Sequence, residues 1–401
     1  MSLLGDANGI IDINFLKRYS ELSLNIKKSE DIIQDLEKYK VISYSSFYNR
    51  FRIVGGGSDI DIEDEMLKAK IPNSNFETLL KQNIELPHIL AKGHFYRTGT
   101  PRLFSYILST EPIISIENSY DGIINIIFSK TIDDNDLKEL SKKNEDAILY
   151  CLYKEEGKIY SLLIDIEKIK AIIHKFRDDL IVVDDLKVLL KDYQNQLSSY
   201  MTDYLLSSEN NLYWVFKGEK QIITSGKKLN RVLTDICDSV YYGTPIQRNE
   251  LINRSKLSGA IQFAKKNLIE ALIKNQTEPN LGLDDDKFPA HKTIYLTLLK
   301  ATGIHSNGHL QAPTDPSYQL LWQTCISFIE KTKAARTSPV ELIELLQKKP
   351  FNLKYGFIEL WLPLFLFINQ DEFALFYEGV YHPDIDMASL ELLSKQLKSL
   401  K

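Results

Sequence analysis

Two carboxylates one residue apart are the feature of this sequence that most directly suggests chemistry. Asp59 and Asp61 follow three consecutive glycines and Ser58, in the stretch GSDIDIE. A strand that presents two carboxylates at this spacing can hold Mg²⁺ ions around the phosphates of a nucleotide. The stretch is therefore compatible with metal-dependent transfer of a nucleotide.

A nucleotidyltransferase-like enzyme that binds metal through Asp59 and Asp61 is one alternative for this chain. Such an enzyme also needs a Gly-Ser pair on a helix that precedes the first aspartate. Here residues 49–51 (NRF) stand in that place, and the glycines directly precede Ser58. We therefore favour a chain without catalytic residues and without a metal at this position.

The remaining short motifs for phosphate, metal or nucleophile chemistry are incomplete. Residues 225–228 (SGKK) lack the earlier glycine and the hydroxyl of a phosphate-binding loop. His305 and His309 are four apart, but neighbouring glycines oppose a helix and no cysteine is near in sequence to complete a zinc site. No serine or cysteine lies in a recognisable nucleophile elbow. We expect no cofactor, and no ATP binding by this chain.

Two arginines flank a glycine turn in the stretch HFYRTGTPR. Arg97 precedes the turn and Arg102 follows it, at the start of an expected strand. A guanidinium group donates parallel hydrogen bonds to phosphate or carboxylate, so both arginines are candidates for an anion site or an interface. A purely structural turn is the alternative.

The charge of the chain is unevenly distributed. The formal net charge is −5, yet residues 217–274 hold eleven Lys or Arg against five Asp or Glu. This stretch is the part of the sequence suited to an anionic partner such as nucleic acid, although a solvated helix surface would look the same. The candidate contact residues are Lys227, Lys228, Arg231, Arg248, Arg254, Lys256, Lys265 and Lys266.

Length and composition set the scale of the fold that must position these residues. At 401 residues, with 44% hydrophobic and 26% charged residues, the chain resembles a folded globular protein with two or three cores. We expect a mostly helical α+β fold. The expected parts are an N-terminal helical segment (1–40), a small α/β domain (41–180), a helical bundle with a basic unit (181–275), and a C-terminal helical region (276–401).

The pattern of apolar residues predicts a group of strands between residues 102 and 153, and a further strand at residues 213–216. Residues 102–108, 123–128 and 147–153 are rich in Ile, Phe and Tyr, and the polar residues 133–144 predict a helix between the last two strands. Such an order is typical of a small α/β domain. Residues 185–206 then repeat leucine and tyrosine with the period of a long amphipathic helix.

Two units with the element order of DNA-binding modules are predicted further on. In the basic stretch, helices are expected over 229–240, over 244–254, and from Ser258 onward, as in a helix-turn-helix. Near the C-terminus, helices over 340–347 and 357–368 precede a hairpin turn at Glu378 and Gly379, as in a winged helix. Because the second of these helices lacks base-reading side chains, we expect this unit to be structural or protein-binding.

The cysteines and the hydropathy of the sequence indicate in which cellular compartment the protein is expected. Three widely separated cysteines form neither a disulfide scaffold nor a metal knuckle, which favours the cytoplasm. The longest apolar run, residues 360–368, is shorter than the roughly 20 residues of a membrane span, so we expect no membrane partner.

Five segments together resemble the region beyond the ATPase core in large P-loop ATPases of bacterial phage-resistance loci, such as the BREX and phage-growth-limitation systems. They are GSDIDIE (57–63), HFYRTGTPR (94–102), YYGTPIQRNELINR (241–254), PFNLKYGFI (350–358) and the hairpin region 371–383. The resemblance implies a non-catalytic piece of a longer, multi-domain defence ATPase. Its implied partners are nucleic acid and other domains or subunits of the assembly.

Overall fold

The computed structural model describes most of the chain, in two compact units. The described residues are 12–39, 41–45, 50–53, 62–71, 75–116, 120–129, 131–154, 157–206, 212–283, 287–383, 385–387 and 389–390. The first unit comprises Met1–Leu79 and Gly157–Leu197, and the second comprises Leu80–Glu156 and Ser198–Lys401.

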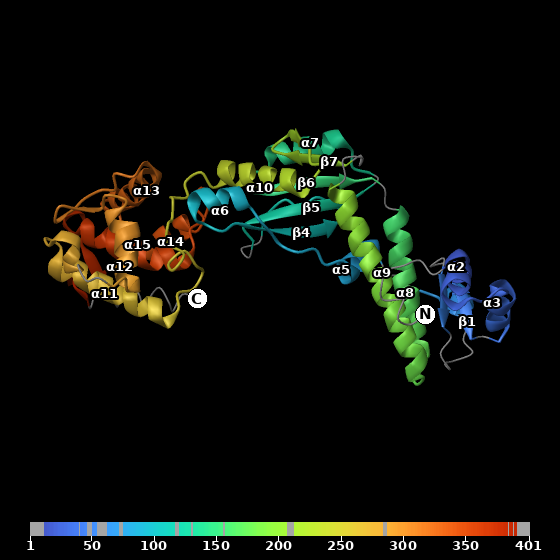
Figure 1. Ribbon diagram of the computed structural model, residues 1–401. Coiled ribbons are helices and arrows are strands. Elements are labelled where there is room, and N and C mark those ends of the chain that lie inside the picture. The colour runs from blue at the N-terminus through green and yellow to red at the C-terminus, as the bar shows by residue number, and fades with distance from the viewer. Residues whose placement is uncertain are drawn as a thin grey trace. The chain divides into compact units, whose positions relative to one another are not determined.

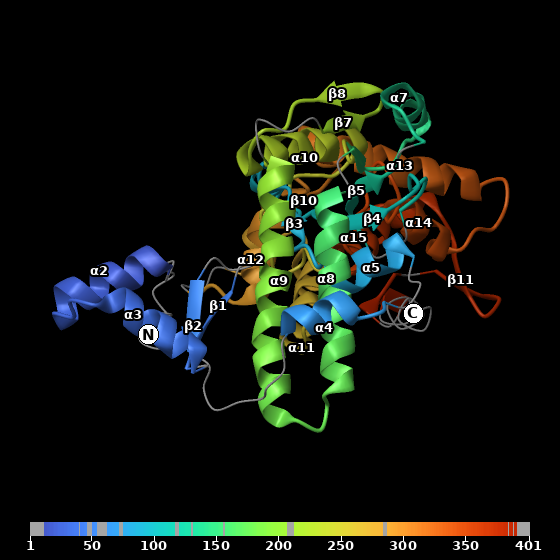
Figure 2. The same cartoon turned by 90° about the vertical axis from the view of Figure 1, so that its right-hand side faces the viewer.

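The first unit begins with two helices and a hairpin around a small core (Figure 2). The elements are α2 (Ile13–Leu24), α3 (Ser29–Lys38), β1 (Ile42–Ser45) and β2 (Arg50–Ile53). Asp12 caps α2 by accepting a 2.7 Å hydrogen bond from the backbone N–H of Phe15. Asn25, at φ 53°, ends the helix. The expected helical segment 1–40 is thus divided by a turn, and its described core is Leu16, Ile33, Ile42 and Phe51.

Two long helices lie side by side, and the second of them continues past Leu197 into the second unit (Figure 2). They are α8 (Gly157–Lys175) and α9 (Leu180–Leu206), accompanied by the short helices α4 (Ile62–Lys68) and α5 (Phe76–Asn83). On α8 the buried residues recur every three or four positions, which is the period of a helix with one apolar face. They are Ile159, Leu163, Ile166, Ile169 and Ile172. Lys175 joins α8 to α4 through a 2.5 Å ion pair with Glu65.

The second unit contains a six-stranded sheet of order β3-β4-β5-β6-β7-β8. Its strands are β3 (Ile89–Leu90), β4 (Leu103–Ser109), β5 (Gly122–Phe128), β6 (Ile148–Tyr153), β7 (Tyr213–Phe216) and β8 (Glu219–Gln221). β4, β5 and β6 are parallel, and the outer pairings are antiparallel. Every residue of β5 and β6 is buried, as expected for central strands covered on both faces. The predicted α/β sheet is confirmed.

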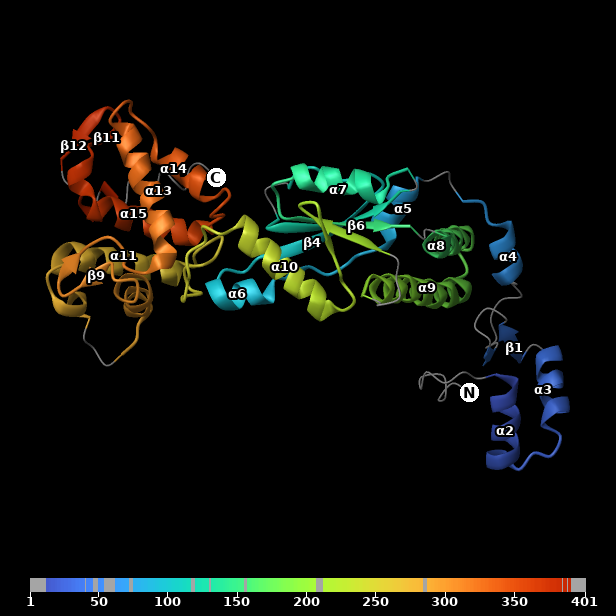
Figure 3. The same ribbon diagram turned by 90° about the horizontal axis from the view of Figure 1, so that it is seen from above.

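Helices cover both faces of this sheet (Figure 3). α7 (Asp134–Lys143) lies on one face, and α6 (Lys92–Thr98) and α10 (Gly226–Val240) lie together on the other. Asp133 opens α7 with a capping box, which confirms the helix expected there. The core under α7 consists of Ile123, Ile127, Leu137, Ile148, Tyr150, Leu152, Tyr213 and Val215.

The rest of the second unit is mainly helical (Figure 1). It comprises α11 (Gly259–Asn275), η1 (Pro279–Gly282), α12 (Ala290–Ile294), the π-helix η2 (Tyr295–Lys300), β9 (His305–Ser306), β10 (His309–Leu310), α13 (Pro316–Thr332), α14 (Pro339–Leu346), α15 (Tyr355–Ile368), η3 (Gln370–Glu372), β11 (Leu375–Tyr377) and β12 (Val380–His382). Residues 355–367 of α15 are all buried, so this helix is central to the core and presents no surface to a partner. The predicted hairpin is confirmed, with Tyr377 paired to Val380 around Glu378 and Gly379.

One predicted helix is wrong. Residues 244–249 have no regular structure, residues 250–254 form turns and bends, and no helix occurs between α10 and α11. Their polar groups bond to distant partners instead: the N–H of Gln247 donates to the carbonyl of Thr98, 2.6 Å away, and the side chain of Asn253 donates to that of Gly99 at 2.9 Å. The fold is mixed α/β and mostly helical as expected, while the tight helix-turn-helix and the winged helix are not confirmed. Among the described residues, no helix is long and apolar enough to cross a membrane.

Candidate functional site

Three of the predicted contact residues lie on the exposed side of α10. Ser225 caps the helix by accepting a hydrogen bond from the backbone N–H of Lys228. The apolar side faces the core, and Lys227, Lys228 and Arg231 are left exposed in the first two turns. Within the described part of the chain, none of these three cations forms an ion pair. The buried side consists of Leu229, Leu233, Thr234, Ile236, Cys237 and Val240.

α6 packs beside α10 and runs in the same direction. At its start, the backbone N–H of Lys92 donates to the side chain of Asn230 at 3.0 Å, and that side chain in turn donates to the carbonyl of Leu90 at 2.7 Å. In the middle, a Cβ on Gly93 would lie 2.9 Å from Thr234, so the glycine permits the close approach. Exposed Lys92 is thereby placed next to the cations of α10.

The irregular segment 244–258 adds three further exposed cations to the second unit: Arg248, Arg254 and Lys256. Bonding of Gln247 to Thr98 holds Arg248 beside the end of α6. Arg254 Nε donates to the carbonyl of Glu250 at 3.0 Å, which leaves the rest of the guanidinium group exposed. Six of the eight predicted contact residues are therefore exposed and without an ion-pair partner among the described residues.

The other two predicted contact residues differ sharply, although they are adjacent on α11. Lys265 is only 6% exposed, and its Nζ lies 3.7 Å from Oε1 of Glu359, itself buried on α15. Its ammonium group is buried in the core and is not accessible to a partner. Lys266 is exposed, and its charge lies near that of Glu270.

The two arginines of HFYRTGTPR also have different surroundings. Arg97 is exposed and forms an ion pair with Asp238 on α10. Arg102 is fully buried: its Nη1 donates to Asp121 at 3.0 Å and its Nη2 to the hydroxyl of Thr244 at 3.0 Å. The carbonyls of Phe351 and Asn352 accept further hydrogen bonds at 2.9 and 2.7 Å. Arg102 thus binds groups of its own chain.

Three of the segments that carry the family resemblance meet at Arg102. Its guanidinium group also lies 4.4 Å from the centre of the Tyr241 ring, and Tyr241 donates a hydrogen bond to the carbonyl of Asp121. Nearby, the N–H of Gly243 donates to the carbonyl of Pro350 at 3.1 Å. The segments 94–102, 241–254 and 350–358 therefore form one buried polar junction between the sheet and the helical region.

The charges around Asp121 in the junction determine the protonation state of its carboxyl group. Burial alone would raise the pKa of this carboxyl, but the charges of Arg102 and Lys354 outweigh burial and hold the pKa below its usual value. Lys354 Nζ lies 2.8 Å from Oδ1 of Asp121. The junction is thus an ionised, paired cluster rather than a proton donor.

His94 is a buried titratable group on α6 that bonds to α10. Its Nδ1 lies 2.8 Å from Asp238, and its Nε2 is buried with no hydrogen-bond partner among the described residues. Burial lowers the pKa of the imidazole, against the opposing hydrogen bond to Asp238. The ring is therefore neutral near pH 7, with Nδ1 as the donor.

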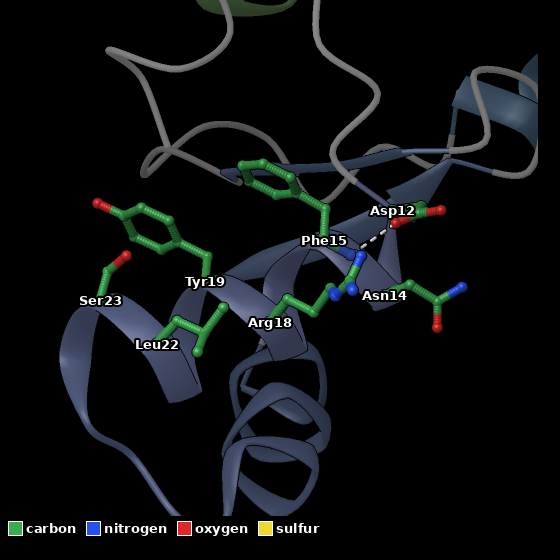
Figure 4. Close-up of a pocket in the computed structure, with 7 residues that line it drawn as sticks. All are labelled: Asp12, Asn14, Phe15, Arg18, Tyr19, Leu22 and Ser23. Carbon is green, nitrogen blue, oxygen red and sulfur yellow. Dashed lines mark hydrogen bonds between the residues drawn. The ribbon is translucent and has the colours of Figure 1, made fainter.

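The structure also has a pocket that is lined by none of the predicted site residues. It has a volume of about 440 Å³ and lies along α2 in the first unit. Phe15, Tyr19 and Ser23 project from successive turns of the helix, and the rings of Phe15 and Tyr19 stack at 5.9 Å (Figure 4). The complete lining is Asp12, Asn14, Phe15, Arg18, Tyr19, Leu22 and Ser23.

The residues considered above as metal ligands do not form a described metal site. Asp59 and Asp61 lie outside the described residues. His305 is buried, with Nδ1 2.9 Å from the Tyr295 hydroxyl and Nε2 2.9 Å from the carbonyl of Gln276. Among the described residues, no group of three His, Cys, Asp or Glu side chains is arranged to hold a metal ion.

Two exposed residues that the sequence did not single out lie on α6, which packs beside α10. Lys92 and Tyr96 lie one helical turn apart on α6, and both are exposed. The pattern KGHFY contains this spacing, but only the packing of α6 against α10 places the start of α6 at Asn230, next to Arg231. Comparisons with protein-family models, with curated proteins and with solved structures find no match for this chain.

Proposed function

We propose that this chain is a non-catalytic segment of a large bacterial anti-phage defence ATPase and that it contacts nucleic acid. The contacts are made by the basic surface, which we define as Lys92, Lys227, Lys228, Arg231, Arg248, Arg254 and Lys256. The defence role rests on the sequence resemblance alone. The contact with nucleic acid rests on the arrangement of charges.

The observation that carries the proposal is the basic start of α10. The N-terminus of a helix bears partial positive charge, so cations there are unfavourable and acidic residues are preferred. α10 has no acidic residue in its first turn, where Lys227 and Lys228 lie instead. Charges placed against the helix dipole and left without partners are suited to an anionic ligand, because that ligand would remove both penalties.

The same surface favours phosphates over bases as the groups contacted. Base reading in a duplex groove relies on Asn and Gln as well as Arg. Asn230 is engaged with α6, and Asn249 donates to the Thr297 hydroxyl at 2.9 Å. The groups left to a ligand are mainly ammonium and guanidinium groups, which bind phosphate without reading sequence.

A second surface supports contact with protein subunits of the assembly. The hairpin β11–β12 carries Phe376, Val380 and Tyr381, which are 40%, 62% and 52% exposed. Phe376 and Tyr381 face each other across the strands at 5.6 Å. Because aromatic residues are enriched at protein interfaces, we assign the predicted winged-helix-like unit a protein-binding role.

Binding of a labelled 20-base-pair DNA by anisotropy, at 50 and 200 mM salt, tests the proposal. Each phosphate neutralised contributes about 0.9 to the slope of log K against log salt. The triple variant Lys227→Ala/Lys228→Ala/Arg231→Ala should therefore lower the slope by up to about 2.7. Lys331→Ala/Lys333→Ala/Lys348→Ala removes the same charge from other exposed positions and should leave the slope unchanged.

Two results would count against this assignment. Absence of any DNA or RNA binding at 50 mM salt would leave the basic surface as a solvated face. A Mg²⁺-dependent nucleotide transfer abolished by Asp59→Ala would instead favour the nucleotidyltransferase alternative.

A further inference from the structure

Tyr96 is the most exposed aromatic side chain near the basic surface. It lies on α6 and is 91% exposed, so its ring contributes little to the packing of the fold. A single exposed aromatic residue is ordinary on a protein surface. Its place on α6 distinguishes it, because the start of α6 bonds to α10 and its end bonds to the segment 244–258.

The packing of α6 against α10 defines that position. Lys92, one turn before Tyr96, is next to Asn230 and hence beside Arg231. One turn further along, Thr98 binds the N–H of Gln247, which places Arg248 at the other end of α6. Tyr96 therefore lies between the cations at the start of α10 and those of the segment 244–258.

The acidic groups on this side of α10 do not cancel these cations. Asp238 is already bound by Arg97 and His94. Asp235 is exposed, and it is the other carboxylate on the helix. Glu250, in the segment 244–258, is exposed as well. The exposed cations outnumber these two carboxylates; they are Lys92, Lys227, Lys228, Arg231 and Arg248.

We propose that the α6–α10 surface binds single-stranded nucleic acid, with a base stacked on the ring of Tyr96 and the flanking phosphates on Lys92, Lys227, Lys228 and Arg231. This inference rests on the proposed function and adds that the bound nucleic acid is single-stranded. In a duplex, both faces of each internal base are covered by its neighbours, whereas an unpaired base can lie on an aromatic ring. Since every base has such a face, binding should depend little on sequence.

Oligonucleotides with and without bases separate stacking from phosphate contact. The probes are a labelled mixed-sequence single strand of 12 nucleotides, the same length of abasic strand, and the matching duplex. Base stacking contributes about 1–3 kcal/mol per base, so the single strand should bind about 5- to 150-fold more tightly than the abasic strand. Tyr96→Ala should remove this difference and leave the abasic strand bound as before.

The matched variants show whether the ring itself is responsible. Tyr96→Phe should keep the difference between the two strands, because the aromatic face is retained. Tyr39→Ala removes a tyrosine that is 72% exposed in the first unit and should change nothing. Circular dichroism of each variant confirms that the fold is intact.

The outcomes for this inference and for the proposed function are distinct. If no probe binds, the proposed function fails. If all probes bind and the triple variant of α10 weakens them, but the single strand and the abasic strand bind equally, the proposed function stands and the stacking role of Tyr96 is overturned. Preference for the duplex over the single strand would likewise overturn it.

Discussion

Arg102 and Asp121 form an ion pair in the interior of the second unit, with Nη1 3.0 Å from Oδ1 and no exposed surface on the arginine. Every other acceptor of the guanidinium group comes from Thr244 or from the backbone of residues 351 and 352. A single side chain therefore links the start of β4 to two segments more than a hundred positions away.

Removal of this guanidinium group should destabilise the second unit strongly. Arg102→Met leaves Asp121 with less compensation and removes one donor from each of the carbonyls of Phe351 and Asn352, of which the Phe351 carbonyl keeps the Thr244 hydroxyl. We expect a loss of about 3–5 kcal/mol in the free energy of unfolding. Arg97→Ala breaks a half-exposed pair and should cost about 1 kcal/mol or less. Urea denaturation followed by far-UV circular dichroism measures both, and equal losses would contradict the assigned roles.

Stability should decline on mild acidification because of His94. Burial lowers the pKa of this imidazole below its ordinary value of 6.5, so between the two values the unfolded chain binds a proton that the folded chain does not. The contribution of neutral His94 to the free energy of unfolding is therefore fully present above pH 6.5. It falls as the pH decreases from there toward the pKa of His94 in the folded chain. Asp121, whose pKa is lowered from 3.8, loses its contribution only at still lower pH.

His94→Asn keeps a donor near Asp238 but cannot titrate. Its free energy of unfolding should vary less between pH 7 and pH 5 than that of the parent protein. Denaturation at four pH values in that interval gives the comparison. Parallel curves would show that another group causes the pH dependence.

The turn at Gly99 should tolerate no side chain. Its φ is 71°, and a Cβ at this position would fall on the carbonyl oxygen of Gln247. Gly99→Ala should cost about 1–3 kcal/mol from the left-handed backbone alone, and more from displacement of the segment 244–258. Gly157→Ala, where a Cβ would meet nothing, is the matched control for a thermal-unfolding measurement.

Much of the sheet was predictable because its central strands are locally distinctive. Residues 122–128 read GIINIIF, an apolar stretch interrupted only by Asn125, as expected of a strand covered on both faces. The sequence could not predict that Arg97 is exposed and Arg102 is buried, because both arginines flank the same turn. Burial of Arg102 depends on Asn352, which lies 250 positions away.

The helix predicted over 244–254 failed for a related reason. Thr244 and Pro245 form a good local start signal, yet the hydroxyl of Thr244 donates to the carbonyl of Phe351 at 2.8 Å. Long-range hydrogen bonds of this kind outweigh helix propensity, which amounts to tenths of a kcal/mol per residue. A sequence pattern within one segment contains no information about such partners.

Lys265 was the predicted contact residue whose position the sequence could have corrected. It lies four positions after Ile261 and three before Leu268, on the stripe of α11 that is buried. Its ammonium group, 3.7 Å from Glu359, forms a charge pair in which the two side chains are 7% and 3% exposed. Gln262 donates to the other oxygen of Glu359 at 2.9 Å.

A double-mutant cycle on this pair should therefore show strong coupling. Lys265→Met leaves a buried carboxylate without its cation, and we expect a loss of about 3–5 kcal/mol in the free energy of unfolding. Adding Glu359→Leu removes the orphaned charge, so the double variant should recover most of that loss. Lys266→Ala, at the exposed neighbouring position, should leave the free energy of unfolding unchanged. Urea titration of the parent, the two single variants, the double variant and Lys266→Ala decides the matter. Additive losses, or a Lys265→Met variant as stable as Lys266→Ala, would show that Lys265 is solvated and free to meet an anionic partner.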